Sequence, residues 1–283
     1  MKTGLVLEGG AKRALFTAGV TDVLMENNIN FDGIIGVSAG AAFGCNYKSN
    51  QPGRAIRYNI RYRKDPRFGG IRSLIKTGDL FEAEFCYHEL PEKLDIFDYE
   101  TYKASPMEFY VVCTDVETGK TLYKKCESMD YNEMEWLRAS ASLPLAANIV
   151  NADGYKLLDG GLSDSIPLKF FQNIGYEKNV VILTRPRGYV KEASKSLPLV
   201  RKKLKAYPNF IRTMEDRPNM YNAQTKYIFE QEKAGNTFVI CPEEALAISD
   251  FDKSIKKIEN VYNAGREIAE KNLDKLKEFL QNK

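Results

Sequence analysis

The chain has 283 residues, of which 43% are hydrophobic and 28% are charged, and this is typical of a globular protein with a sizeable buried core. Lysine and arginine outnumber aspartate and glutamate by 41 to 38, and a net charge of +3 is too small to indicate nucleic-acid binding. The single histidine, His88, excludes every mechanism that needs two, including HExxH zinc chemistry. A Ser-His-Asp triad remains only if His88 is its base.

The five cysteines are widely spaced, odd in number and without a CxxC pair, which is typical of free thiols in a reducing compartment. The sequence contains no run of about 18 apolar residues to span a membrane. The first apolar run stops at Glu8, before it reaches the length of a signal sequence. We therefore expect a cytoplasmic protein that holds no metal and no cofactor.

The N-terminal part alternates strand and helix patterns. Residues 3–7 and 31–37 are short apolar runs with the composition of buried strands. Residues 11–27 carry apolar side chains at helical spacing, and residues 39–47 are a helix of small residues. This β-α-β-α order predicts a parallel sheet with helices packed on its faces.

Five further segments have the composition of strands, and turn sequences join four of them into two hairpins. The hairpins pair residues 109–114 with 121–125 and residues 148–150 with 155–158, and the fifth strand is residues 180–184.

The composition changes near residue 185. Residues 185–205 hold eight lysines and arginines but one acidic residue, and prolines interrupt them. Beyond this stretch we expect a helix over residues 217–234 that begins after Pro218, a strand at 237–241 and a long amphipathic helix over 253–280. We therefore divide the chain into a core, residues 1–185, and a mostly helical extension packed on it, residues 186–283.

A G-x-S-x-G pentapeptide runs from Gly36 to Gly40, with Ser38 at its centre. It follows a predicted buried strand and precedes the small-residue helix, which is the setting of a nucleophile elbow. In such an elbow a sharp turn exposes the serine hydroxyl, and the helix N-terminus directs free amides at the reacting centre. The alternative is a serine that only caps the helix.

A nucleophilic serine needs a base, and two side chains are candidates. His88 does not follow the end of a predicted strand. We therefore expect it to be a hydrogen-bonded side chain outside the site. Asp159 ends a predicted strand and precedes Gly160 and Gly161, which places a carboxylate at the sheet edge where the elbow lies. The alternative for Asp159 is a plain turn.

The loop Gly9-Gly10-Ala11 follows the first predicted strand and opens the next helix. Its amides are placed to donate to an oxyanion at the same edge of the sheet. The loop matches neither the P-loop pattern nor G-x-G-x-x-G, so it does not indicate nucleotide binding. The alternative is a structural glycine-rich connection.

Taken in order, these motifs resemble the patatin-like phospholipase family. The resemblance rests on the loop at residues 7–14, the elbow at 36–40, the R-A-S-A-S-L-P segment at 138–144 and the D-G-G motif at 159–161. It covers about residues 1–185 and is greatest for the bacterial branch that carries a C-terminal helical extension. It implies an α/β fold, a three-layer α/β/α sandwich with a mostly parallel central sheet, plus that helical extension.

The resemblance also implies a lipid acyl hydrolase of the phospholipase A or esterase type, which acts through a Ser-Asp dyad and an acyl-enzyme. The implied roles are Ser38 as nucleophile, Asp159 as base, the amides of Gly9, Gly10, Ala11 and Ala39 as oxyanion hole, Gly36, Gly40, Gly160 and Gly161 as structural glycines, and Arg13 as a candidate substrate contact. The sequence departs from the family loop at Ala11 and Ala14, where the family has glycine. If residue 11 needs a positive φ, alanine there costs about 1 kcal/mol or more.

Three functions stay open at this point: a hydrolase, an acyltransferase with the same dyad, and a catalytically silent lipid-binding protein, which only the two alanines favour. The expected substrate is a phospholipid or another acyl ester, and we expect no nucleic-acid partner. Residues 54–76 hold eight lysines and arginines against one acidic residue, which favours a lid or a peripheral contact with an anionic membrane. A solvated basic helix and loop is the alternative.

Overall fold

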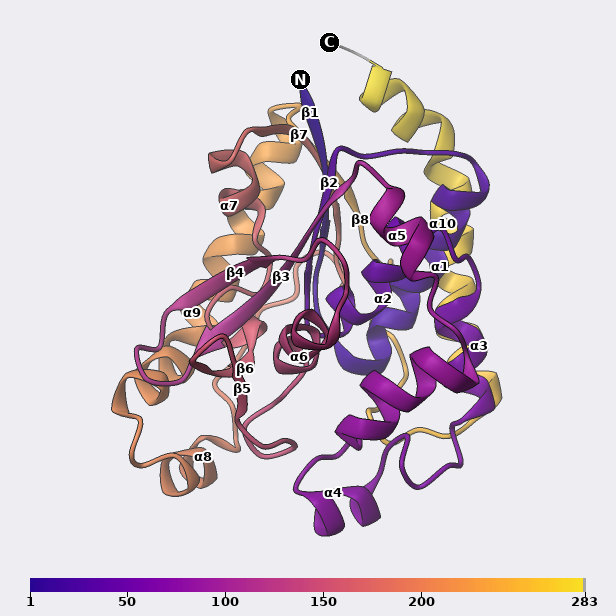
Figure 1. Ribbon diagram of the computed structural model, residues 1–283. Coiled ribbons are helices and arrows are strands. Elements are labelled where there is room, and N and C mark those ends of the chain that lie inside the picture. The colour runs from indigo at the N-terminus through magenta and orange to yellow at the C-terminus, as the bar shows by residue number, and fades with distance from the viewer. Residues whose placement is uncertain (282–283) are drawn as a thin grey trace.

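The computed structural model describes residues 1–281, which form one central sheet with helices around it (Figure 1). The strands are β1 (Lys2–Leu7), β2 (Gly33–Val37), β3 (Glu108–Asp115), β4 (Thr121–Lys125), β5 (Val150–Ala152), β6 (Tyr155–Asp159), β7 (Tyr176–Ile182) and β8 (Thr237–Ile240). Their order in the sheet is β5-β6-β3-β2-β1-β7-β8, and β4 pairs with β3 outside this path. Neighbours from β3 to β8 pair in parallel, whereas β4, β5 and β6 pair antiparallel as the two predicted hairpins require.

Helices cover both faces of the sheet. They are η1 (Ala11–Ala14), α1 (Leu15–Glu26), α2 (Ala39–Lys48), α3 (Arg54–Arg61), α4 (Ile71–Thr77), the π-helical η2 (Phe85–Leu94), α5 (Tyr99–Ala104), α6 (Tyr131–Ser140), η3 (Gly160–Leu162), α7 (Leu168–Asn173), α8 (Leu197–Lys203), α9 (Pro208–Lys233) and α10 (Ile255–Gln281). Figure 1 shows α1, α2 and α10 on one side of the strands and α7 and α9 on the other. This arrangement confirms the predicted three-layer α/β/α sandwich with a mostly parallel sheet. Within residues 1–281, no helix combines the length and the apolar composition that crossing a membrane requires.

The central strands send alternate residues into two separate cores. On β1, Leu5 and Leu7 pack into the core beneath α1, α2 and α10, whereas Val6 packs into the core beneath α7 and α9. On β2, Ile34 and Ile35 divide between the two cores in the same way. Since successive side chains of a strand point to opposite faces, a parallel sheet covered on both sides needs the continuous apolar runs that the sequence shows.

Residues after 185 contribute both to the sheet and to its helical layers. The strand β8 pairs in parallel with β7 and extends the sheet at that edge. The helix α10 lies against α1, and two glycines let their backbones approach closely. A Cβ on Gly19 of α1 would collide with the Tyr262 carbonyl oxygen, and a Cβ on Gly265 of α10 would collide with that of Phe16. Both contacts hold the C-terminal segment against the sheet.

One predicted helix boundary is wrong. The sequence places the start of a helix at residues 217–218, but α9 begins at Pro208 and continues through Pro218. Proline is well tolerated in the first turn of a helix, because its missing N–H has no intrahelical partner there. Pro218 removes an internal hydrogen bond, and the burial of Met214 and Tyr221 on either side outweighs this loss.

Candidate active site

Ser38 lies at a sharp turn between β2 and α2, with φ 56° and ψ −129°. A non-glycine residue rarely adopts a positive φ, so this backbone is strained. The two flanking positions have no room for a side chain. A Cβ at Gly36 would collide with Ala41, and a Cβ at Gly40 would lie 2.6 Å from the Glu8 carbonyl oxygen. The turn therefore has the geometry of a nucleophile elbow, which the G-x-S-x-G pattern predicts.

The end of α6 holds the backbones of both predicted catalytic residues. The Ser38 N–H donates to Ser140 Oγ at 2.8 Å, and that hydroxyl donates to the Val112 carbonyl at 2.6 Å. Two residues further on, the Ser142 carbonyl accepts a hydrogen bond from the Asp159 N–H at 2.9 Å. Sequence reasoning missed the role of Ser140, because nothing in R-A-S-A-S-L-P distinguishes its two serines.

Asp159 ends β6 and is 2% exposed. One carboxylate oxygen accepts a hydrogen bond from the Gly161 N–H at 2.8 Å, and the Asp159 carbonyl accepts one from the Thr114 hydroxyl at 2.8 Å. A Cβ at Gly160 would collide with the Val112 carbonyl, so the D-G-G motif fits here only with glycine at that position. The motif thus fixes the carboxylate in one orientation.

Burial raises the pKa of the Asp159 carboxyl above its ordinary value. Hydrogen bonding with the Ser38 side chain opposes this rise, followed by the charge of Arg217 and the Gly161 N–H. Ser38 and Asp159 also line the same cavity, so the structure brings the two residues together. A carboxylate with a raised pKa is a stronger base than an aspartate in water.

The glycine-rich loop lies against Ser38. A Cβ on Gly9 would be 2.9 Å from Ser38 Cβ, and one on Gly10 would be 2.6 Å from the Thr184 hydroxyl. Within residues 1–281, the N–H groups of Gly9 and Gly10 donate to no protein acceptor. Ala11 follows them with φ 46°, so the positive φ considered for this position is present and costs alanine about 1 kcal/mol. The amides of this loop and that of Ala39, the first residue of α2, are available to a ligand.

Glu8 anchors this loop, although in sequence it marked only the end of an apolar run. Its carboxylate is buried and accepts hydrogen bonds from the Thr184 N–H at 2.6 Å and the Tyr221 hydroxyl at 2.8 Å. Burial raises the pKa of Glu8. These contacts tie the end of β1 to the end of β7 and to α9.

A cavity of about 710 Å³ opens over Ser38 and Asp159, a volume in the range of ligand sites. The glycine-rich loop and Arg13 line it, and apolar side chains form much of its wall. Examples of the apolar lining are Phe43, Phe68, Leu80, Leu137, Leu143 and Leu162. Such a wall suits an acyl chain, because apolar burial is its source of binding free energy.

His88 is not among the residues that line the cavity. Its Nε2 atom lies 3.1 Å from a carboxylate oxygen of Glu135, and its ring stacks on Tyr131 at 4.3 Å between centroids. The structure thus gives His88 partners of its own away from the cavity wall.

The family model described as Patatin-like phospholipase matches residues 5–171, more than half of the chain. The chain belongs to the patatin-like phospholipase family. A second model, described as a domain of unknown function (DUF6363), matches residues 207–281, which lie in the predicted extension.

The relatives match only part of their own length. The uncharacterized protein YjjU of Escherichia coli strain K12 is 32% identical over 198 residues, which cover 65% of this chain and 52% of YjjU. Lysophospholipase NTE1 of Coccidioides immitis strain RS is 25% identical over 293 residues, covering 97% of this chain and 18% of that protein. This chain therefore spans about half the length of YjjU and less than a fifth of the lysophospholipase. The crystal structure of VipD from Legionella pneumophila matches 97% of this chain and 67% of that chain at 12% identity, with a TM-score of 0.49.

Proposed function

We propose that this protein is a lipid acyl hydrolase that cleaves carboxylic esters through a Ser38–Asp159 dyad and an acyl-enzyme. The observation that carries the proposal is the strained turn at Ser38 beside the buried carboxylate of Asp159. Membership of the patatin-like phospholipase family supports lipid-ester hydrolysis as the general activity. The single histidine supports a dyad rather than a triad, because His88 has other partners.

The reaction follows from the positions of these groups. Asp159 accepts the proton of the Ser38 hydroxyl while Ser38 Oγ bonds to the ester carbonyl carbon. The oxyanion so formed accepts hydrogen bonds from free amides of the glycine-rich loop and of Ala39. As the ester bond breaks, the leaving alcohol takes the proton from Asp159. Asp159 then removes a proton from water, which attacks the acyl-enzyme, and returns that proton to Ser38 Oγ as the fatty acid is released.

The test uses p-nitrophenyl esters of increasing chain length and a fluorophosphonate probe. We expect Ser38→Ala to lose both hydrolysis and labelling, since the bond-forming oxygen is absent. We expect Asp159→Asn to lower kcat by a factor of about 10² to 10⁴, the usual contribution of a general base. The matched control is His88→Gln, which should keep both activities. Labelling that persists in Ser38→Ala would overturn the assignment.

The same experiment distinguishes the two alternative functions. An acyltransferase shares the dyad and the acyl-enzyme and differs only in the acceptor. A burst of nitrophenol that stops after one turnover and resumes when an alcohol acceptor is added would indicate transfer. The absence of both turnover and labelling in the wild-type protein would indicate a silent lipid-binding protein.

We infer a cytoplasmic enzyme whose peripheral contact with anionic membrane is made by α4. Within the basic stretch of residues 54–76, Arg54, Arg57 and Arg67 are already paired with carboxylates. In α4, by contrast, Ile71 is 64% exposed and Ile75 is 81% exposed, and basic residues accompany both. A double change of both isoleucines to serine should weaken binding to anionic vesicles, and unchanged binding would contradict this role.

A further inference from the structure

Four cationic side chains line the catalytic cavity and come from separate parts of the chain. We call Arg13, Arg185, Lys191 and Arg217 the cationic wall. Arg13 follows the glycine-rich loop in η1, Arg185 and Lys191 follow β7, and Arg217 lies in α9. All four are half-buried, and Arg217 lies in the segment that matches the domain of unknown function.

Carboxylates lie near the cationic wall, but none is in ion-pair contact with it in the part of the chain that the structure describes. Within residues 1–281, none of its members forms an ion pair with a carboxylate. The Nε atom of Arg13 is buried without a hydrogen-bond partner. Other cations around the cavity are neutralised or occupied: Arg54 pairs with Asp95, Arg138 pairs with Glu135, and Lys12 donates to the Asp252 carbonyl.

Neutral groups hold the cationic wall in place. Arg217 donates to the Gly161 carbonyl at 2.6 Å, and Arg185 lies 4.4 Å from the ring centroid of Tyr189. Lys191 lies 4.5 Å from the ring centroid of Tyr221. These contacts orient the cations without bringing a carboxylate within ion-pair distance of them.

The charges in the cationic wall repel one another. Burial and the charge of Arg217 lower the pKa of Lys191 to about 8, and burial and the charge of Arg185 lower the pKa of Arg13. The carboxylate of Glu8 opposes both shifts, although its own hydrogen bonds go to Thr184 and Tyr221. Asp250 opposes the shift at Arg13. An anion in the cavity would relieve this repulsion.

The cationic wall reaches the reacting groups through Gly161. A Cβ built on Gly161 would lie 3.1 Å from Asp159 Oδ1 and 3.5 Å from Arg217 Nη2, so both groups border the same small space. An anion bound to Arg217 would therefore lie close to Asp159, the proposed base. Guanidinium groups suit a phosphate there, because they can donate two hydrogen bonds to its oxygens.

We propose that the cationic wall is an anion subsite that binds a phosphate on the alcohol portion of the substrate, so that this protein selects acyl esters of phosphorylated alcohols. The proposal rests on the hydrolase function proposed above. Three of the four cations, Arg185, Lys191 and Arg217, lie at or after residue 185. The proposal therefore gives this part of the chain a role in substrate specificity.

The test compares two substrates that differ only in the phosphate: a 1-acylglycerol 3-phosphate and the 1-acylglycerol of the same chain length, both below their micellar concentrations. We expect the wild-type kcat/KM to favour the phosphate ester by at least tenfold. We expect Lys191→Gln and Arg185→Gln each to reduce this ratio severalfold, mainly through a higher KM for the phosphate ester. Lys191→Arg should restore the ratio, because it retains the charge.

Two controls make the result decisive. The matched variant Lys202→Gln removes an exposed lysine of α8 that does not line the cavity, and it should keep the wild-type ratio. Fluorophosphonate labelling counts correctly folded sites in every variant. Equal kcat/KM for both esters in a labelled wild-type enzyme would overturn the anion subsite alone. Absence of labelling and of turnover on either ester would instead overturn the hydrolase function.

Discussion

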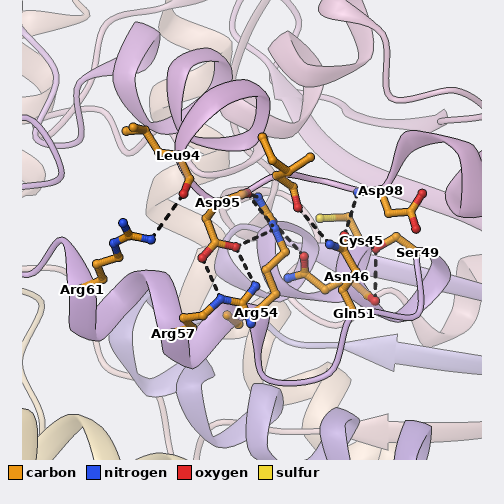
Figure 2. Close-up of polar contacts among 12 residues, drawn as sticks. Cys45, Asn46, Ser49, Gln51, Arg54, Arg57, Arg61, Leu94, Asp95 and Asp98 are labelled. Carbon is orange, nitrogen blue, oxygen red and sulfur yellow. Dashed lines mark hydrogen bonds and ion pairs between the residues drawn. The ribbon is translucent and has the colours of Figure 1, made fainter.

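Cationic side chains gather at two places in this protein, and their partners differ. Figure 2 shows the first, where Arg54 is 4% exposed and lies 3.3 Å from the Asp95 carboxylate. Arg57 donates two hydrogen bonds of 2.8 Å to the same carboxylate, and Arg54 also donates to Asn46 Oδ1 at 2.9 Å. The second place is the cationic wall, whose four members form no ion pair within residues 1–281.

The difference indicates what each group of cations does. Around Asp95, the pairing joins α2, α3 and the residue that follows η2, so the charges are part of the framework. A buried cation is tolerated there because a carboxylate and carbonyl groups compensate for the lost hydration. In the cationic wall no ion pair is present among the described residues, so the lost hydration is compensated only in part, which reduces folding stability but leaves the charges available to a ligand.

The largest effect that this comparison predicts is at Asp95. Asp95→Asn keeps the shape of the side chain but leaves Arg54 buried without a counter-charge. We expect the free energy of unfolding to fall by about 3–5 kcal/mol, as measured when one partner of a buried pair is removed. Urea denaturation followed by circular dichroism measures this loss.

A matched control for Asp95→Asn is available in α3, the helix that carries Arg54 and Arg57. Arg61 is exposed, donates to the Leu94 carbonyl at 3.5 Å (Figure 2) and lies 5.4 Å from the ring centroid of Tyr62. Arg61→Gln should change the free energy of unfolding by less than about 0.5 kcal/mol. If Asp95→Asn were equally mild, the paired group would not be part of the framework, and the comparison would fail.

The cationic wall predicts a smaller effect with a distinct pH dependence. The pKa of Lys191 is about 8 in the folded protein and near its ordinary value of about 10.4 when unfolded. Between these two values the unfolded chain binds more protons, so the contribution of Lys191 to stability becomes more favourable as pH rises. In the folded protein this group interacts with Arg217, Glu8, Arg185 and Arg13.

We therefore expect Lys191→Met to be more stable than the wild type below pH 8. Its advantage should shrink above pH 8 by up to about 1.4 kcal/mol per pH unit, because the wild-type lysine loses its charge. Urea denaturation at several pH values from 7 to 10 measures the difference in free energy of unfolding between the two proteins. Groups that titrate in both proteins contribute equally to each and cancel in this difference. A constant difference across that range would show that Lys191 is not held in a repulsive environment.

The sequence predicted the framework of the site better than its electrostatics. The elbow at Ser38 and the strand end at Asp159 depend on local patterns of glycine and of apolar residues, so they could be located from sequence. Glu8 and Ser140 act through partners far away in the chain, which no local pattern reveals. Charge counts also failed to separate the two groups of cations, because residues 54–76 and 185–205 are equally rich in lysine and arginine. Only the folded chain shows which of these charges have partners.

The smallest predicted effect concerns an ion pair outside both groups of cations. Arg67 lies 3.2 Å from Glu89 and 2.9 Å from Asp65, with 42% of its side chain exposed. Because water solvates these charges in any case, Glu89→Gln should lower the free energy of unfolding by less than about 0.5 kcal/mol, and added salt should reduce even that. Urea denaturation at low and high ionic strength measures both quantities. A loss comparable to that of Asp95→Asn would mean that pairing alone, rather than pairing of buried charge, distinguishes the framework cations from the cationic wall.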